Sequence, residues 1–567
     1  MASDKLEAAP ITLHDLLEGE KEFRAPVFQR RYVWAKKHLD TLWEDIDAIL
    51  DGEDARRFLG ALVLQDRSSG LAFAPKSYWM VDGQQRITTL YLTLLAIARS
   101  AERNGDVELA DQIVKRYLLN QSGQNRHRPK IRPTNRDLRQ FAVVVSSLET
   151  EEAELPEGFG EESEKMTQAY ARLEAEVANR VKRGGNGSLK TLATALLESL
   201  GFVQISLSDE QDPHQVFDRL NDAGEDLGTI DLVRNVVFAK FGDEYQRAES
   251  FYNTKWRPSF EDSLASNIDG FFFPFTLAHE PDTTKSQVFS TLKKRWTTAE
   301  PAAIFEELIE FVSPYKALVV GEALETSGLL ADAIARLQRM PAPTVIYPFA
   351  MRVIHAALNG TLEASRAAQN LALIEAFLVR RSVSGFEATG LHSIFKDLWK
   401  STQGDPHKVL ERIQTSTIRL PDDATFCEDI KTKGLYGRRL TPYILLEYEL
   451  GLEGARDRLS PQTLRETMTV DHVLPQDYGL HIAELMSKKT HENIVHTWAN
   501  LVPLSGPLNS SKGDRPWSEI RDDLRTETVF ATTKRLAERQ ETWNADEIGK
   551  RAESLCRWAL TRWPRTP

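Results

Sequence analysis

The chain has 567 residues, of which 41% are hydrophobic and 27% are charged, and its formal net charge is -12. This length exceeds a typical domain of about 150 residues, and the composition is that of a soluble protein with ample core material. The negative balance argues against indiscriminate binding of nucleic acid, yet it allows a local basic groove.

No targeting segment is evident. The first residues lack the apolar stretch of a signal peptide, and no apolar run is long enough to span a bilayer. We therefore expect a cytoplasmic protein without a membrane partner. Only Cys427 and Cys556 are present, and because they lie far apart in sequence we expect neither a disulfide framework nor a cysteine-based zinc site.

Two adjacent arginines lie among aromatic residues near the start of the chain, at 25–34. Guanidinium groups bind phosphate and aromatic faces stack on bases, so this stretch can serve nucleic acid. An equally good interpretation packs Phe28 and Trp34 into the core as an edge segment. Helical spacing of apolar residues follows over 39–46.

Residues 58–66 and 78–81 read as strands, and a glycine turn then leads into a helix from Ile87 onward. The first amides of such a helix can hold an anion such as phosphate. Asp82 can hold a metal or orient a water, and Arg86 can pair with phosphate oxygens. The alternative is an aspartate N-cap followed by solvated glutamines and a surface arginine.

The order Asp-Gly-Gln-Gln-Arg, followed by Ile-Thr-Thr-Leu, resembles the signature of the ParB/sulfiredoxin-like N-terminal domain of GmrSD-type, modification-dependent (type IV) restriction endonucleases. In that family the motif is associated with nucleotide binding and hydrolysis, which implies GTP or ATP as a ligand here. The nucleotide-binding residues implied by the resemblance are Asp82, Gly83, Gln84, Gln85, Arg86 and Thr88.

The earlier Gln-Arg pair with Tyr-x-Trp resembles the opening of the same domain. In relatives that sense phosphorothioate DNA this region contributes to reading the modification. The candidate DNA-binding residues in it are Gln29, Arg30, Arg31 and Tyr32.

The densest positive stretch of the chain lies at 126–139. It is interpreted either as a phosphate-contacting strip or as a solvated loop and helix face. The candidates for phosphate contact are Arg126, Arg128, Lys130 and Arg132. A strand is expected over 202–207, and the block at 216–224 resembles a second block of the family. Helical periodicity then continues over 245–450 and predicts a bundle.

A second informative region lies at 469–512. Asp471-His472, then Asn500, then Asn509 have the order of an HNH, or His-Me finger, nuclease, and resemble the C-terminal nuclease domain of the same family. The last position is Asn509 where the motif has histidine, which leaves the metal preference open. Three further histidines lie between these blocks and are expected to be surface or structural residues: His481, His491 and His496.

The chemistry of phosphodiester hydrolysis explains these residue types. A neutral imidazole suits the general base, which we assign to His472. Hard oxygen ligands suit Mg²⁺ or Mn²⁺, which we assign to Asp471 and Asn509. Asn500 is expected to pin the loop that orients His472, and Lys512 to contact phosphate.

These observations predict an α+β, mostly helical chain. Residues 1–244 would form the ParB/sulfiredoxin-like domain with a small mixed sheet, 245–454 a helical linker bundle, and 455–567 the ββα-metal HNH domain. The predicted function is a modification-dependent DNA endonuclease or nickase of antiphage defence, gated by nucleoside triphosphate. Its expected partners are modified double-stranded DNA and the nucleotide.

Three alternatives stay open. The trigger is either modified cytosine or a phosphorothioate linkage. A rival from another class is a nucleotide-regulated DNA-binding protein with an inert nuclease domain. The sequence leaves a homodimer open as well.

Overall fold

The computed structural model describes residues 7–26, 29–68, 75–121, 127–146, 148, 164–184, 187–207, 228–242, 244–324, 326, 328–341, 344–386, 390–415, 420–452 and 460–566. The chain divides into two compact units. The first consists of Met1–Arg257 with Thr298–Pro301, and the second of Pro258–Thr297 with Ala302–Pro567. The three predicted domains therefore differ from the observed division, because the central helices and the C-terminal segment lie in one unit.

A six-stranded mixed sheet forms the centre of the first unit, in the order β1-β6-β3-β4-β2-β5. β3 pairs antiparallel with β4 and parallel with β6, while β2 pairs parallel with β4. The strands predicted at 58–66 and 202–207 are thus confirmed as β3 and β6. The strand bounds are β1 (Glu7–Thr12), β2 (Lys21–Arg24), β3 (Arg57–Asp66), β4 (Lys76–Asp82), β5 (Ile131–Arg132) and β6 (Leu200–Leu207).

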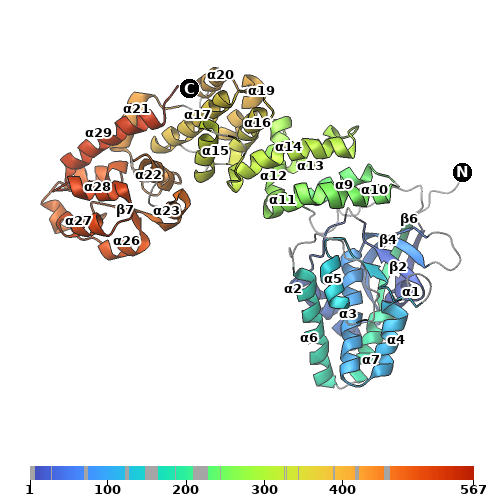
Figure 1. The fold of residues 1–567 in the computed structure, drawn as a ribbon. Helices are drawn as coiled ribbons and strands as arrows, with labels where there is room; N and C mark the ends of the chain where they lie inside the picture. The colour runs from blue at the N-terminus through green and yellow to red at the C-terminus, as the bar shows by residue number, and fades with distance from the viewer. Residues whose placement is uncertain are drawn as a thin grey trace. The chain divides into compact units, whose positions relative to one another are not determined.

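The longest helices of the first unit pack beside this sheet (Figure 1). α3 follows the glycine turn and contacts α4, α6 and α7, so most of its residues are buried, including polar ones such as Thr89 and Thr93. The helix bounds are α1 (Leu13–Leu17), α2 (Lys36–Leu50), α3 (Gln84–Arg103), α4 (Val107–Ile113), η1 (Val114–Leu118), α5 (Leu138–Val145), α6 (Lys165–Gly184), α7 (Gly187–Thr194), η3 (Ala195–Ser199), α9 (Thr229–Ala239) and α10 (Tyr245–Phe251).

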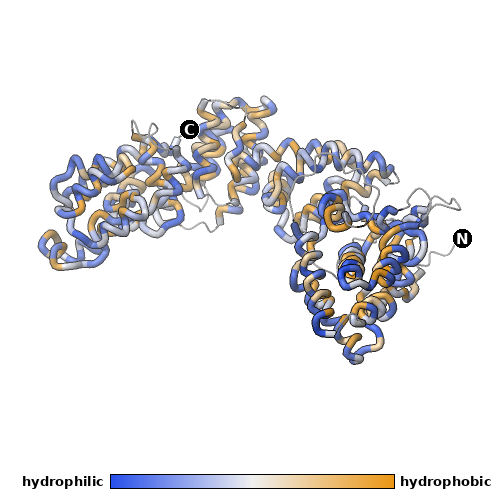
Figure 2. Tube along the Cα trace, turned by 60° about the horizontal axis from the view of Figure 1, so that its bottom comes forward, coloured by the Kyte–Doolittle hydropathy of each residue, from blue (hydrophilic) through white to orange (hydrophobic). Residues whose placement is uncertain are grey.

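The second unit begins with a run of helices, as the periodicity predicted. Hydrophobic and hydrophilic positions alternate along them, which is the pattern of helices that bury one face (Figure 2). The bounds are η4 (Tyr252–Glu261), which crosses the boundary, and then α11 (Asp262–Leu264), η5 (Ala265–Asn267), α12 (Ile268–His279), η6 (Lys285–Gln287), α13 (Val288–Arg295), α14 (Pro301–Val319), α15 (Leu329–Arg339), η7 (Thr344–Ile346), α16 (Tyr347–Leu358), α17 (Ala364–Val383), α18 (Leu391–Phe395), α19 (Leu398–Thr402) and α20 (Pro406–Thr415).

The C-terminal part of this unit contains one antiparallel strand pair, β7 with β8, and α26 follows β8 directly. The remaining helices surround the pair. The bounds are α21 (Asp423–Thr432), α22 (Thr441–Leu450), α23 (Pro461–Thr467), β7 (Met468–His472), α24 (Leu480–Ala483), α25 (Lys488–Ile494), η8 (Trp498–Asn500), β8 (Leu501–Ser505), α26 (Gly506–Lys512), α27 (Trp517–Thr526), α28 (Ala531–Arg539) and α29 (Ala545–Arg562).

A buried ionic cluster joins the central helices to the last helix. Arg562 on α29 lies 2.6 Å from carboxylate oxygens of both Glu375 and Glu447. Arg336 pairs with Glu375 at 2.9 Å, and Arg339 pairs with Glu447 at 2.7 Å. Because removing one partner would leave buried charge uncompensated, this cluster holds the second unit together.

The two cysteines pair, contrary to the expectation from their separation in sequence. Cys427 on α21 and Cys556 on α29 form a disulfide, with their Cα atoms 5.2 Å apart. These two helices lie side by side. The pairing depends on that long-range contact, which spacing alone did not indicate.

Candidate functional site

The strand pair β7–β8 and helix α26 position the predicted nuclease residues. Asp471 and His472 are the last two residues of β7 and lie opposite Val502 and Leu501 of β8. α26 starts within one residue of the end of β8, so the helix lies against the strand that carries the Asp-His pair.

His472 is buried, with 2% of its surface exposed. The Nε2 atom of His472 lies 3.1 Å from Nδ1 of His496, and the centres of the His472 and Tyr436 rings lie 4.2 Å apart. Burial lowers the pKa of His472 to about 3, and electrostatic interactions with His496, Lys512 and His491 act in the same direction. The imidazole is therefore neutral at physiological pH, as a proton acceptor must be.

A segment from outside the motif holds His496 in place. The backbone amides of Leu435 and Tyr436 donate to the carbonyl of His496 at 2.7 and 3.2 Å, and Gly434 forms a bridge with Thr497. His496 was expected to be a surface or structural residue, and its ring contacts the candidate base His472. No residue near 434–436 carries a motif, so only the fold could reveal this contact.

Asn500 is fully buried, and both polar atoms of its side-chain amide form hydrogen bonds with protein groups. Its Oδ1 accepts from the Leu474 amide at 2.8 Å and from Trp543 Nε1 at 3.0 Å. Its Nδ2 donates to the carbonyls of Leu474 and Val495 at 3.0 and 2.8 Å. These bonds fix the loop two residues after His472, so Asn500 is placed as a positioning residue without a direct contact to substrate.

Asp471 lies close to Lys512. Its Oδ2 atom is 3.0 Å from the Lys512 ammonium, although the alignment is not that of a hydrogen bond, and this oxygen has no hydrogen-bond partner within the described residues. Lys512 is only 3% exposed. Lys512 was expected to contact DNA phosphate, and in this arrangement its ammonium is buried against Asp471.

The oxygen donors available to a cation are few. Asn509 on α26 donates through Nδ2 to Thr469 Oγ1 at 3.0 Å, which leaves its carbonyl oxygen as the possible ligand. In the described parts of the chain no group of three or more His, Cys, Asp or Glu residues could hold a metal ion. One carboxylate and one amide oxygen fit a Mg²⁺ or Mn²⁺ site that water and a substrate phosphate complete. Because a cation at Asp471 competes with Lys512, such a site is weak.

The other two histidines of this region differ in their surroundings. His491 is 2% exposed and its Nε2 lies 2.8 Å from the carbonyl of Pro475, so it is structural, as predicted. His481 is partly exposed on α24, where its ring lies against Gly479.

In the first unit, the glycine turn is a tight junction between β4, α3 and β3. Gly83, with a φ of 88°, caps α3, so the alternative of an aspartate N-cap was wrong. A Cβ atom on Gly83 would lie 2.3 Å from a methyl of Leu62, and one on Gly60 would lie 2.2 Å from Arg86. Glycine is therefore required at both positions.

Arg86 joins α3 to the bulged strand β3. Its guanidinium donates to the carbonyls of Leu59 and Ala61 and lies 3.1 Å from Oδ2 of Asp82. The side chains of Asp82 and Arg86 are 29% and 23% exposed. The pair is thus accessible in part, while most of the guanidinium is occupied by backbone carbonyls.

The two motifs of the first unit form one hydrogen-bonded assembly. Gln84 and Gln85 donate to the carbonyls of Arg30 and Arg31 at 2.5 and 3.1 Å. In return, Gln29 Nε2 donates to the carbonyl of Val81 at 2.6 Å.

Further residues of both motifs are buried in this assembly. The hydroxyl of Tyr32 lies 2.8 Å from that of Thr89. Five residues predicted to contact nucleotide or DNA are buried in this assembly: Gln29, Tyr32, Gln84, Gln85 and Thr88. Arg30 and Arg31 remain half-buried at the surface.

The predicted basic strip is not continuous. Lys130 is 1% exposed and its ammonium donates to the carbonyls of Leu17 and Gly19 at 2.8 and 2.7 Å, so its assignment to DNA was wrong. Burial lowers its pKa to about 8. Arg132 lies 3.8 Å from Glu249. Arg128 is exposed.

Some predicted features lie outside the described residues: Arg126 and the family block at 216–224.

Two family models match the chain. The model of the GmrSD restriction endonuclease N-terminal domain matches residues 13–238, and that of the GmrSD restriction endonuclease C-terminal domain matches residues 420–558. No curated protein matches the chain. Among the described residues, no helix is both long and apolar enough to cross a membrane.

The two matches together cover more than half of the chain, and each contains one of the motif assemblies described above. The N-terminal match includes the glycine turn at 82–86, and the C-terminal match includes the strand pair with Asp471 and His472. The chain belongs to the GmrSD restriction endonuclease family.

Proposed function

We propose that this chain is a modification-dependent DNA endonuclease of antiphage defence, and that it cuts through an HNH, or His-Me finger, site. The observation that carries the proposal is the placement of Asp471 and His472 at the end of β7 beside Asn509 on α26. Two antiparallel strands followed by a helix support the ββα-metal architecture expected from the resemblance.

His472 acts as the general base in this proposal. Its Nε2 faces His496, so Nδ1 is the nitrogen that accepts the proton of the attacking water. As the water oxygen bonds to phosphorus, the bond from phosphorus to the 3′-oxygen breaks and that oxygen takes a proton from solvent. Burial keeps the imidazole neutral beforehand, which is the form that this step needs.

Asp471 and Asn509 would hold Mg²⁺ or Mn²⁺. The bound ion would supply positive charge to the phosphate as negative charge develops in the transition state. Within the protein, Lys512 balances the carboxylate of Asp471, and Thr469 orients the amide of Asn509. The single carboxylate predicts a weak metal site that fills together with DNA.

The ring of Tyr436 and the burial of His472 indicate that access of substrate to the site is restricted. With 2% of His472 exposed, substrate reaches the base only if the segment at 434–436 shifts. Such a shift is a natural target for gating by the first unit, through nucleoside triphosphate (GTP or ATP) at the turn 82–86 and through modified DNA.

A plasmid panel tests the proposal. Unmodified, glucosylated or hydroxymethylated, and phosphorothioate plasmids are incubated with the full chain, Mg²⁺ or Mn²⁺, and GTP or ATP. We expect nicking or cleavage of one modified class, and loss of it in His472→Ala. DNA binding without cleavage of any plasmid would instead support the regulatory DNA-binding alternative.

A further inference from the structure

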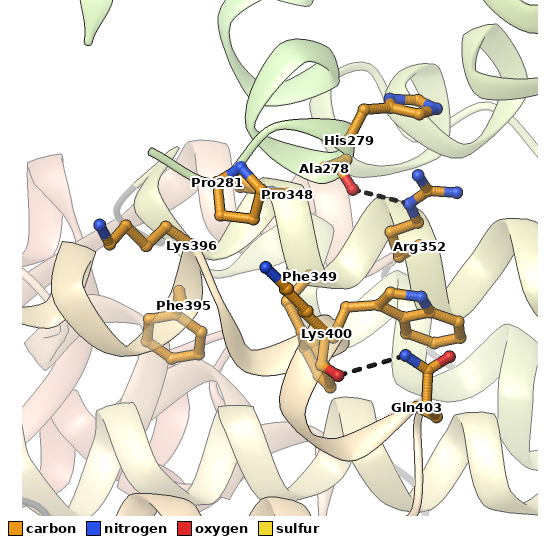
Figure 3. Close-up of a pocket in the computed structure, with 11 residues that line it drawn as sticks. Ala278, His279, Pro281, Pro348, Phe349, Arg352, Phe395, Lys396, Lys400 and Gln403 are labelled. Carbon is orange, nitrogen blue, oxygen red and sulfur yellow. Dashed lines mark hydrogen bonds between the residues drawn. The ribbon is translucent and has the colours of Figure 1, made fainter. Parts of the chain in front are cut away.

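A cavity of about 250 Å³ lies among the central helices of the second unit, in the part of the chain between the two family matches. The end of α12, the start of α16, and α18 with α19 surround it (Figure 3). None of the motifs described above contributes a residue to it.

The wall of this cavity is positively charged. Arg352, Lys396 and Lys400 line it, and none of the described residues that line it is acidic. Arg352 donates from Nε to the carbonyl of Ala278 at 2.9 Å, which fixes the guanidinium plane. In Figure 3 the side chain of Lys400 extends toward Pro281, whereas the ammonium of Lys396 points away from Arg352.

Two acidic side chains near the cavity interact with the charge of Arg352: Glu307 and Glu310. Glu307 lies 2.7 Å from Arg295 and 3.3 Å from His279, and Glu310 lies 3.1 Å from His355. Since three cationic side chains and no acidic one are among the described residues that line the cavity, its wall keeps an excess of positive charge.

One exposed carboxylate competes for a lysine of the cavity. Asp282 lies 2.8 Å from Lys396, and its side chain is 93% exposed. Such an exposed ion pair is weak, so a multiply charged ligand can displace it.

Flat apolar surface accompanies the charge. Phe349 is fully buried in the wall, so the aromatic face open to a ligand is that of Trp399, which is half-buried beside it. Aromatic faces bind planar rings, while guanidinium and ammonium groups bind phosphate oxygens. The volume is slightly below the range of about 300 to 1,000 Å³ for ligand pockets, so it fits a small ligand and excludes duplex DNA.

We propose that this cavity binds the phosphate monoester of a planar ring compound of about the size of a mononucleotide. Arg352 and Lys400 hold the phosphate, Lys396 adds positive charge nearby, and Trp399 packs against the ring. The proposal does not depend on the nuclease assignment, because no residue of the strand pair or of the glycine turn takes part.

Calorimetric titration of the full chain tests this assignment, with inorganic phosphate, ribose 5-phosphate and AMP or GMP as probes. We expect a mononucleotide to bind more tightly than ribose 5-phosphate. Lys400→Gln, at an exposed lysine, should weaken binding of the mononucleotide by about 10-fold, the usual effect of losing one charged hydrogen bond. Asp282→Asn should tighten it, because the competing carboxylate is removed.

Lys408→Gln is the matched control. It removes the same charge from an exposed lysine of α20 that does not line the cavity, so binding should stay as in the wild type. Trp399→Leu should weaken the binding of the mononucleotide while leaving the binding of ribose 5-phosphate unchanged. Absence of binding by every probe, or equal binding in the Lys400 and Lys408 variants, would overturn the site. Equal affinity for mononucleotide and ribose 5-phosphate would overturn the ring contact.

Discussion

The imidazole of His496 faces the candidate base directly. Its Nδ1 lies 3.1 Å from Nε2 of His472, and two neutral rings can share that contact only if one nitrogen carries the hydrogen. For His472 to accept a proton at Nδ1, its Nε2 has to donate to His496. His496 thus selects the tautomer of the base.

A matched pair of variants tests this role. His496→Leu removes the acceptor, and we expect cleavage to fall by about 10- to 100-fold, as for partners that orient catalytic groups. His496→Asn keeps an oxygen close to the position of Nδ1 and should retain most activity. Rates of plasmid nicking measure both variants. Equal loss in the two would show that His496 only fills space.

Asp137 gives the first unit a pH-dependent stability. This carboxylate is 2% exposed and accepts from the Tyr32 amide and the Thr134 hydroxyl, each at 2.8 Å. Burial is the main cause that raises its pKa from 3.8 to about 6. A raised pKa means that the folded state binds the proton more tightly than the unfolded state.

The stability that Asp137 contributes is therefore present below pH of about 4 and is lost as pH rises through about 6. The difference between the folded and unfolded pKa values corresponds to about 3 kcal/mol in the free energy of unfolding. Asp137→Asn should remove this dependence. We expect the stabilities measured by urea denaturation to agree near pH 4, where both side chains are neutral, and to diverge as pH rises, with the wild type losing stability relative to the variant. A constant difference between them from pH 4 to 7 would contradict the assignment.

At the scale of elements, α22 supports the nuclease fold from outside its motif. Glu449 at the end of α22 is 1% exposed and accepts from the backbone amides of Ala531 and Thr532 at 2.6 and 2.8 Å. Those amides begin α28, whose N-terminal end attracts negative charge. Glu449 thus caps α28, which packs against β8.

We expect Glu449→Ala to lower the free energy of unfolding by about 2 kcal/mol or more, since it leaves two buried amides without partners. Glu466→Ala is the control, because Glu466 is exposed and accepts a hydrogen bond from Gln462 on the same helix. That change should stay within about 0.5 kcal/mol of the wild type. Denaturant midpoints decide between the two outcomes.

The elements themselves were largely predictable. Alternation and turn residues located β3, β4 and β6, and the order of Asp471, His472, Asn500 and Asn509 located the candidate nuclease site. These features depend on residues close in sequence or on a motif, so spacing is informative.

What sequence could not predict depends on long-range contacts. The approach of the segment at 434–436 to His496, the disulfide of Cys427, and the burial of Lys130 against backbone carbonyls all join residues far apart in the chain. The charge pattern also does not show which lysines are exposed, because a lysine in a basic stretch need not lie at the surface. The sequence pattern likewise gave no sign that Gln84 and Gln85 of the glycine turn are buried.

At the scale of the whole molecule, the C-terminal nuclease domain was predicted to begin at residue 455, and it has supporting contacts with residues before that position. The family match starts at residue 420, and the cluster of Glu375, Glu447 and Arg562 joins central helices to α29. A fragment limited to 455–567 would lose these partners, so the second unit is the smallest piece that retains the site with its supports.

At this scale we also propose that nucleotide bound by the first unit changes DNA cleavage by the second unit. Asp82→Asn removes a charge from the glycine turn while leaving the Arg86 bonds to β3 in place. We expect loss of nucleotide hydrolysis and a changed rate of DNA cleavage, since a nucleotide acts on cleavage only through differential affinity for the states of the protein. Asp51→Asn, at an exposed position after α2, is the control. Loss of hydrolysis with unchanged cleavage would show that the units act independently.

The most direct test of the central claim is cleavage of a modified plasmid by the full chain with and without a divalent cation. The proposed site requires cleavage in Mg²⁺ or Mn²⁺, none in excess EDTA, and at least about 100-fold slower cleavage by His472→Ala with DNA binding retained. His481→Ala should cut like the wild type. Equal cleavage by the His472 variant, or cleavage that persists in EDTA, would contradict the claim that the strand pair with Asp471 and His472 is the nuclease.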